Sequence, residues 1–209
     1  MHENVLPEHS DRLLEALEDL GSPRLDGWTL AGGTGLALQL GHRVSEDFYF
    51  FRTDHMDVRQ LHEVFSDLCD YETLQEAEHT LTIIAYETKI SFFRVPDPFI
   101  FDRKDYRFFK VAAVDEIALM KLVAVSGRGS RKDFIDLCRI LRTGKGLQEY
   151  FDLLPEKYSD QRLNNYLILK SLTFFEDAER EPMPKMLQPF DWEECREFFI
   201  REAHALVLR

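Results

Sequence analysis

The first segment that could do chemistry is Gly32-Gly33-Thr34, which stands directly ahead of a short helical pattern through Leu36 and Leu40. A Gly-Gly turn at a helix start leaves backbone N–H groups free at the positive end of the helix dipole, and Thr34 adds a hydroxyl. Such a turn suits a phosphate group. The alternative is a structural turn at which only glycine meets the backbone geometry.

The second segment runs from Ser45 to Phe51, and its aromatic content predicts a strand. On a strand, residues 47 and 49 share one face, so an Asp-x-Asp pair there would direct two carboxylates at one metal ion. Tyr49 occupies the second position, which leaves Asp47 as the candidate metal ligand. The alternative is that Asp47 is a turn or capping residue at the start of the strand.

The third segment runs from Lys121 to Lys145 and carries seven Lys or Arg against two Asp. Its net charge is +5, in a chain whose total is −12. The two acids, Asp133 and Asp136, are three residues apart and share a helix face. One interpretation is an electropositive surface for a polyphosphate or an RNA backbone. The other is a solvated helix face with local ion pairs, as most charge runs are.

The composition narrows the class of protein. With 209 residues, 44% of them hydrophobic, the chain can bury a substantial core. It has no run of roughly 18 apolar residues and no signal-peptide pattern, so we expect a cytoplasmic protein without membrane partners. Three cysteines without CxxC spacing predict reduced, half-buried thiols and no zinc site. The acidic total argues against a general nucleic-acid coat but leaves room for a local basic site.

The elements that must position these segments change character near Val111. Strands lie before this point, and after Val114 every segment has helical period. We therefore expect an α+β lobe over residues 1–110 and a helical lobe over residues 111–209.

Hydrophobic spacing sets the expected elements. In the first lobe we expect helices at 10–20 (with Ser10 as the N-cap and Gly21, Ser22 and Pro23 as the end), 34–40 and 57–70, and strands at 28–31, 47–51, 73–76, 81–86 and 89–95. Pro96 and Pro98 are expected to end the sheet. In the second lobe we expect five helices, at 115–125, 130–141, 147–154, 161–175 and 191–208.

Three stretches are more specific together than any one alone. LAGGTGLALQLGHRVSEDFYFF, from Leu30 to Phe51, resembles the opening motif of the AbiEii/AbiGii nucleotidyltransferase family, the toxins of type IV toxin–antitoxin systems in abortive phage infection. In that family a Gly-Gly-Thr/Ser turn precedes Gly-His-Arg and an Asp-x-Asp strand. EIALMKLVAVSGRGSRKDFIDLCRIL resembles the second block, and FFEDAEREPMPKMLQPFDWEECREFF resembles the C-terminal block. The resemblance covers most of the chain in the expected order.

The resemblance implies a fold like that of DNA polymerase β, with a small mixed sheet flanked by helices and a helical bundle after it. It also implies transfer of a nucleotidyl group from an NTP, in some members to the 3′ end of a tRNA, with Mg²⁺ as cofactor. A toxin of this type implies a cognate antitoxin as partner. Residue by residue, the resemblance assigns catalysis to Asp47 (which would also hold the metal), Lys132, Asp133 and Asp136, and nucleotide binding to Gly32, Gly33, Thr34, Lys121 and Arg131.

The chain departs from the family pattern at Tyr49, where the second aspartate belongs. Ser91, on the strand at 89–95, stands where many relatives of polymerase β place a third carboxylate. The leading hypothesis is therefore nucleotidyl transfer to an RNA acceptor such as tRNA, by a site that lacks part of its metal motif. The alternative is a catalytically inactive module that binds nucleotide, RNA or a partner protein. The carboxylates that could replace the missing one are Glu46, Glu87 and Asp136.

Overall fold

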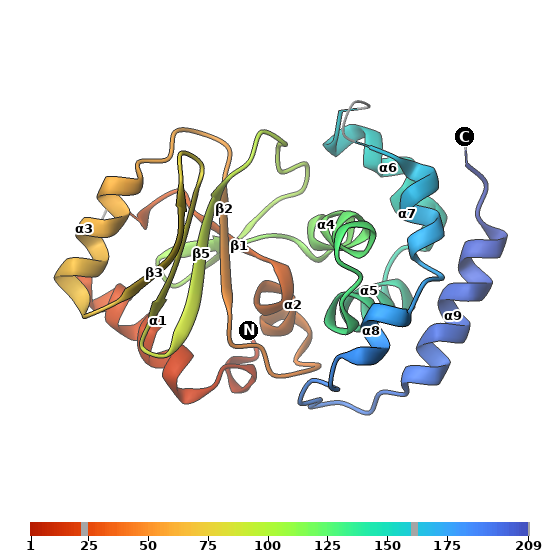
Figure 1. The fold of residues 1–209 in the computed structure, drawn as a ribbon, viewed down its shortest axis with the longest axis horizontal. Helices are drawn as coiled ribbons and strands as arrows, with labels where there is room; N and C mark the ends of the chain where they lie inside the picture. The colour runs from red at the N-terminus through yellow and green to blue at the C-terminus, as the bar shows by residue number, and fades with distance from the viewer. Residues whose placement is uncertain (22–24, 160–162, 209) are drawn as a thin grey trace. The chain divides into compact units, whose positions relative to one another are not determined.

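Figure 1 shows the computed structural model of the chain, which describes residues 1–21, 25–159 and 163–208. The chain divides into two compact units. Unit 1 consists of Met1–Pro98 and Asp102–Ala113, and unit 2 consists of Phe99–Phe101 and the chain from Val114 onward. The lobe boundary expected from the sequence, between residues 110 and 111, lies inside the last strand of unit 1.

Unit 1 is built on one mixed sheet of seven strands in the order β3-β4-β5-β2-β1-β7-β6. The pairs β1–β7 and β2–β5 are parallel, and the other neighbours are antiparallel. The mixed sheet expected for the nucleotidyltransferase fold is thus confirmed. The strands are β1 (Thr29–Ala31), β2 (Phe48–Arg52), β3 (Glu72–Ala77), β4 (Thr80–Ala85), β5 (Thr88–Arg94), β6 (Lys104–Tyr106) and β7 (Phe109–Val111).

The two faces of the sheet differ in burial. In unit 1, α1 (Glu8–Leu20) and α3 (Val58–Leu68) lie on one side of the sheet and α2 (Gly32–Leu40) on the other, after the short helix η1 (Glu3–Val5) (Figure 1). Phe48 and Phe50 of β2 are buried in the core on one face. Because side chains alternate along a strand, Tyr49 points to the opposite, partly exposed face.

Three details of the elements predicted from the sequence differ in unit 1. Ser10 is not the N-cap of the first helix: Pro7 precedes α1, and the buried Ser10 hydroxyl donates to the Glu46 carbonyl at 3.0 Å. The sheet does not end at Pro96 and Pro98, because β6 and β7 extend it beyond these prolines. Gly21 ends α1 in the left-handed conformation, whereas Ser22 and Pro23 lie outside the described residues.

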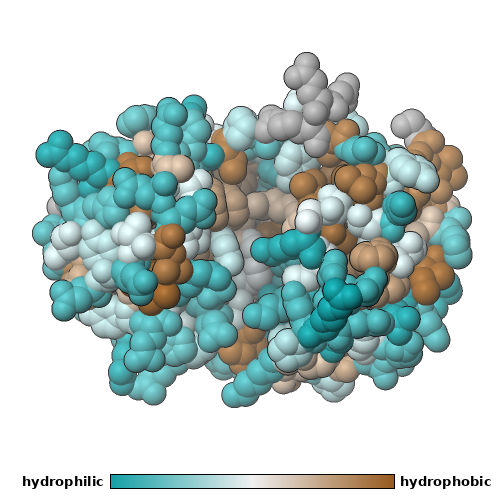
Figure 2. Space-filling view, in the orientation of Figure 1, coloured by the Kyte–Doolittle hydropathy of each residue, from teal (hydrophilic) through white to brown (hydrophobic). Residues whose placement is uncertain are grey.

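Unit 2 is a helical bundle around an aromatic core. The ring of Phe134 lies 5.1 Å from that of Phe175, 6.1 Å from that of Trp192 and 5.4 Å from that of Phe199. Its described helices are α4 (Val114–Gly127), α5 (Arg131–Thr143), α6 (Leu147–Lys157), α7 (Asn165–Ser171), α8 (Glu176–Arg180) and α9 (Trp192–Ala205). Apolar side chains also reach the surface, including Leu167 of α7 and Ile200 of α9, as the brown areas over these helices in Figure 2 indicate.

Two expectations for unit 2 are wrong in detail. The helix expected at 161–175 is the shorter α7, with α8 following it as a separate helix, and Gln161 lies outside the described residues. Cys138 and Cys195 are fully buried rather than half-buried, while Cys69 is half-buried; all three are free thiols. None of the helices in the described ranges has the length and apolar character needed to cross a membrane.

Candidate nucleotide site

The Gly-Gly turn begins α2, and a side chain is disfavoured at each of the two glycines for a different physical reason. Gly32 has φ +66°, in the left-handed region, and a Cβ there would lie 3.6 Å from the Tyr49 ring. At Gly33 a Cβ would overlap the guanidinium of Arg43, which is almost fully buried and donates to the Val44 carbonyl at 3.0 Å. The turn therefore places a fixed positive charge beside the N-terminus of α2.

Thr34 connects this turn to the segment that carries Asp47. Its hydroxyl is fully buried, lies 2.8 Å from the Ser45 hydroxyl and donates to the backbone carbonyl of Asp47. The Thr34 side chain thus holds the residue that precedes β2. The structure brings Gly32, Gly33, Thr34 and Asp47 together in unit 1.

The Asp47 carboxylate already has a cationic partner. Lys89 Nζ lies 3.0 Å from Asp47 Oδ2, and it lies 5.8 Å from the centre of the Tyr49 ring. The side chains of Lys89 and Asp47 are 38% and 32% exposed. Desolvation opposes the charged form of Lys89, but the hydrogen bonds and charges of Asp47 and Tyr49 outweigh it and hold the pKa of Lys89 above its ordinary value.

Strand register explains this pairing. In the parallel pair β2–β5, Phe48 stands opposite Ile90 and Tyr49 opposite Ser91. One step further back, Asp47 meets Lys89 on the partly exposed face of the sheet. The Ser91 hydroxyl is turned to Thr82 of β4, 3.0 Å away.

The residues around Asp47 do not fit a metal ion held by the protein. Two-metal chemistry needs carboxylates that bridge the cations, and Mg²⁺ prefers oxygen ligands. Here one carboxylate faces an ammonium group and a phenol. Glu46 is exposed with its carboxylate 3.9 Å from His9, and Glu87 is exposed in the turn between β4 and β5. The described ranges contain no group of three or more His, Cys, Asp or Glu placed to hold a metal.

In unit 2 the candidate residues form a buried ionic network. Lys121 Nζ lies 2.7 Å from Asp133 Oδ1 and 2.6 Å from Asp136 Oδ2. Lys121 is 5% exposed, and both carboxylates are fully buried. Arg128 donates twice to Asp133, at 2.6 and 2.9 Å, and the Ser130 hydroxyl adds a third hydrogen bond at 2.9 Å. The network therefore spans the end of α4 and the start of α5.

The sequence folds this way because Ser130 and Asp133 have capping-box spacing at the start of α5. Ser130 caps the helix by accepting from the Asp133 N–H at 3.3 Å. Burial alone would raise the pKa of Asp133, but the Lys121 charge and the Arg128 hydrogen bonds outweigh it and lower the pKa to about 2. Asp133 is therefore ionised near neutral pH and compensated on both sides.

The two remaining candidates lie away from this network. Lys132 is exposed on α5. Arg131 donates to the Ala178 and Glu179 carbonyls at the end of α8, at 2.7 and 3.1 Å, and its guanidinium lies 4.9 Å from the Trp192 ring. The structure therefore groups Lys121, Asp133 and Asp136, whereas Arg131 is engaged with α8.

Sequence reasoning missed Lys89 and Arg43 as members of the site. The only signal for Lys89 was its position two residues before Ser91, which matches that of Asp47 before Tyr49. That signal gains meaning only when the two strands are known to pair in parallel. For Arg43, its place in the Gly-His-Arg run of the family motif was a signal, but the spacing did not indicate burial against Gly33.

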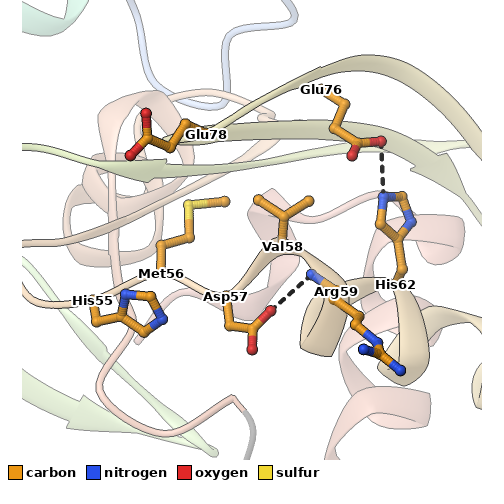
Figure 3. A pocket seen from close by; sticks show the side chains of 8 residues that line it. All are labelled: His55, Met56, Asp57, Val58, Arg59, His62, Glu76 and Glu78. Atoms are coloured by element: carbon orange, nitrogen blue, oxygen red, sulfur yellow. Dashed lines mark hydrogen bonds and ion pairs between the residues drawn. The ribbon is translucent and has the colours of Figure 1, made fainter.

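A separate hollow of about 650 Å³ lies in unit 1 beside α3 (Figure 3). Its lining includes His62, which lies 3.2 Å from Glu76 Oε2 and 2.8 Å from the Tyr71 hydroxyl. The full lining is His55, Met56, Asp57, Val58, Arg59, His62, Glu76 and Glu78. None of the residues assigned to the candidate site lines it.

Most of the chain matches one protein family. Residues 12–205 match the family described as "Nucleotidyl transferase AbiEii toxin, Type IV TA system". The chain belongs to this family. It is also 36% identical, over 195 residues, to an uncharacterised protein of Aquifex aeolicus (strain VF5), covering 90% of this chain and 92% of that one.

Solved structures give the same fold. JHP933 from Helicobacter pylori is similar with a TM-score of 0.62 and 19% identity, over 96% of this chain and 92% of that one. MenT4, a nucleotidyltransferase toxin from Mycobacterium tuberculosis H37Rv, is similar with a TM-score of 0.60 and 14% identity, over 95% of this chain and 84% of that one. The resemblance found in the sequence and the expected fold class are thus confirmed.

Proposed function

We propose that this chain transfers a nucleotidyl group from an NTP to an RNA acceptor such as tRNA. The observation that carries the proposal is the joining of the Gly-Gly-Thr turn to Asp47 through the Thr34 hydroxyl, in a chain of the AbiEii family. A site that receives NTP and RNA would act in the cytoplasm, where both are present.

In unit 1, groups of the chain itself bind the NTP and orient it for transfer. The N–H groups of Gly32 and Gly33 at the start of α2 donate to phosphate oxygens, helped by the helix dipole and the nearby Arg43 charge. Thr34 fixes the backbone at Asp47. Asp47 and its ion-pair partner Lys89 then lie beside the reacting phosphate.

In unit 2, the basic segment around α5 contacts the RNA or the nucleotide. Lys132 is exposed, and so is the Arg128 side chain at 59%. Lys121, Asp133 and Asp136 act as positioning residues, because their network holds Arg128 at the start of α5. Arg131 contributes by holding α8 against α5.

A second candidate function is nucleotide binding without transfer. The Asp47–Lys89 ion pair and Tyr49 favour it, because together they leave one compensated carboxylate where a pair would hold Mg²⁺. Both candidate functions require that unit 1 binds an NTP. Membership of a type IV toxin–antitoxin family also supports a cognate antitoxin as partner.

The test is to incubate the purified protein with each labelled NTP and total tRNA. Label transfer that is lost in Asp47→Ala supports the enzyme. Asp105→Ala is the matched control, because Asp105 is another aspartate of unit 1 paired with a lysine, Lys110, at 2.7 Å. Absence of transfer with all NTPs contradicts the enzyme and leaves the binding module.

Tyr49→Asp is a sharper probe of the same question. It restores the second carboxylate of the Asp-x-Asp pattern on the same strand face as Asp47. If the rest of the site is intact, we expect transfer activity to appear or increase. A Tyr49→Phe variant, which keeps the ring and adds no charge, should not produce this gain.

A further inference from the structure

The partner of Asp47 is fixed by the sheet. Lys89 lies on β5 and Asp47 directly precedes the parallel strand β2, one step before the pair Phe48–Ile90, and the ammonium group lies 3.0 Å from the carboxylate. A divalent cation on Asp47 would sit beside this ammonium and be repelled by it. Tyr49, under the same ammonium, offers a phenol and no second carboxylate.

The same ammonium group is suited to an anion. A lysine carries three N–H donors; Asp47 takes one and the Tyr49 phenol is a second partner, which leaves one donor for a ligand. The Lys89 side chain is 38% exposed, so solvent and solutes reach it. The centre of the Tyr49 ring lies 5.8 Å from the Lys89 ammonium, and the ring would lie 3.6 Å from a Cβ at Gly32, so the same ring neighbours the ammonium and the start of α2.

The charges around the turn add to this preference. Arg43 lies against Gly33, and the N-terminus of α2 carries the positive end of its dipole. Both features favour a phosphate chain, and neither attracts a metal ion. Since the Asp47–Lys89 pair is neutral as a whole, an incoming phosphate meets no uncompensated carboxylate.

We propose that the Lys89 ammonium group takes the place of a divalent cation at Asp47 and binds the polyphosphate of a nucleotide without metal. This inference rests on the NTP binding that both candidate functions share. It differs from them in assigning the cationic contact of the phosphates to a residue of this chain and not to a metal ion.

The first experiment uses no nucleotide. Mn²⁺ is titrated into the full chain and followed by electron paramagnetic resonance, in wild type and in the Tyr49→Asp/Lys89→Ser double variant. We expect no saturable Mn²⁺ site at Asp47 in wild type and one new site in the double variant. A saturable wild-type site that disappears in Asp47→Asn overturns the inference.

The second experiment measures NTP binding by calorimetry in EDTA and in Mg²⁺. We expect wild type to bind an NTP equally in both, and Lys89→Met to weaken binding in EDTA by about 10- to 100-fold. Lys89→Arg should retain most of the affinity. Lys110→Met is the matched control, because Lys110 is also a half-exposed lysine of unit 1 paired with an aspartate, and it should bind as wild type does.

The outcomes separate the inference from the proposed function. NTP binding that requires Mg²⁺, or that Lys89→Met leaves unchanged in EDTA, overturns the inference and leaves the proposed function standing. No binding of any NTP in either buffer contradicts the proposed function and the anion-binding half of the inference, and the Mn²⁺ titration still decides the other half. Near-ultraviolet circular dichroism shows that each variant is folded.

Discussion

Each unit of this protein contains a lysine–aspartate cluster, and the two differ in burial. In unit 1, Lys89 and Asp47 form a pair that solvent reaches from one side. In unit 2, Lys121 lies between the fully buried Asp133 and Asp136. Exposed pairs contribute little to stability and can exchange partners, whereas a buried pair cannot lose one member without a large cost. We therefore propose that the same residue types serve ligand binding in unit 1 and stability in unit 2.

The largest expected effect comes from breaking the buried cluster. Lys121→Met leaves two buried carboxylates with Arg128 as their remaining cation near Asp133, and it should destabilise unit 2 by about 3–5 kcal/mol. The measurement is urea unfolding in a Trp28→Phe background, in which Trp192 alone reports on unit 2.

Lys110→Met is the comparison for this variant. Lys110 pairs with the exposed Asp105, so its loss should change stability by no more than about 1 kcal/mol. This change is measured in a Trp192→Phe background, in which Trp28 reports on unit 1. Equal effects of Lys121→Met and Lys110→Met would show that burial does not set the cost of losing the lysine.

The two units can also be compared by the packing around one glycine in each, Gly33 in unit 1 and Gly127 in unit 2. Gly33→Ala should destabilise unit 1 by about 1–3 kcal/mol, because the new methyl overlaps the buried Arg43 guanidinium. Gly127→Ala, at the end of α4, meets no atom within 4 Å and should be neutral or stabilising by up to about 1 kcal/mol. Thermal unfolding followed by Trp28 and Trp192 fluorescence, one in each unit, measures both changes.

Removing the Arg43 head group tests the cause. In an Arg43→Ala background, Gly33→Ala should lose most of its cost, since the overlapping group is gone. An undiminished cost would show that the turn geometry itself, and not Arg43, requires glycine at this position.

Lowering the pH should destabilise the buried cluster of unit 2, because Asp133 becomes protonated. Its pKa is about 2 in the folded chain against 3.8 as the ordinary value, so its contribution to stability is present above pH 4 and is lost as the pH falls toward 2. Unit 2 should lose about 2 kcal/mol over this range through Asp133. Urea unfolding at pH 4, 3 and 2, read by Trp192, gives the slope.

Two asparagine variants isolate that slope. Asp133→Asn should be less stable at neutral pH and should lack this part of the acid dependence. Asp115→Asn removes a different carboxylate of unit 2, the half-buried Asp115 of α4, which pairs with Lys145. This variant should retain the acid dependence that comes from Asp133. Equal slopes in wild type and Asp133→Asn would contradict the assignment.

The smallest expected change in stability is at the exposed pair. Asp47→Ala should alter the unfolding of unit 1 by no more than about 1 kcal/mol, while abolishing label transfer if the proposed enzyme is active. The stability measurement uses Trp28 in a Trp192→Phe background. A loss of several kcal/mol would show that Asp47 is structural, as Asp133 is.

The amino-acid sequence alone determined the local architecture. The apolar spacing of Leu61, Val64 and Phe65 predicts α3, and the aromatic content of residues 47–51 predicts β2. The Gly-Gly-Thr turn, Asp47 and the Lys-Asp-x-x-Asp helix were sufficient to indicate the family. These features are readable because periodicity and turn chemistry act within a few residues.

The tertiary structure alone decided how the charged side chains are used. Strand register, set by packing between distant segments, places Lys89 against Asp47, and helix packing buries Lys121 with both aspartates of α5. The short β6 and β7 likewise form only because β1 offers β7 an edge to pair with. A charge pattern shows which residues are available, but burial and pairing decide whether a charge stabilises the fold or meets a ligand.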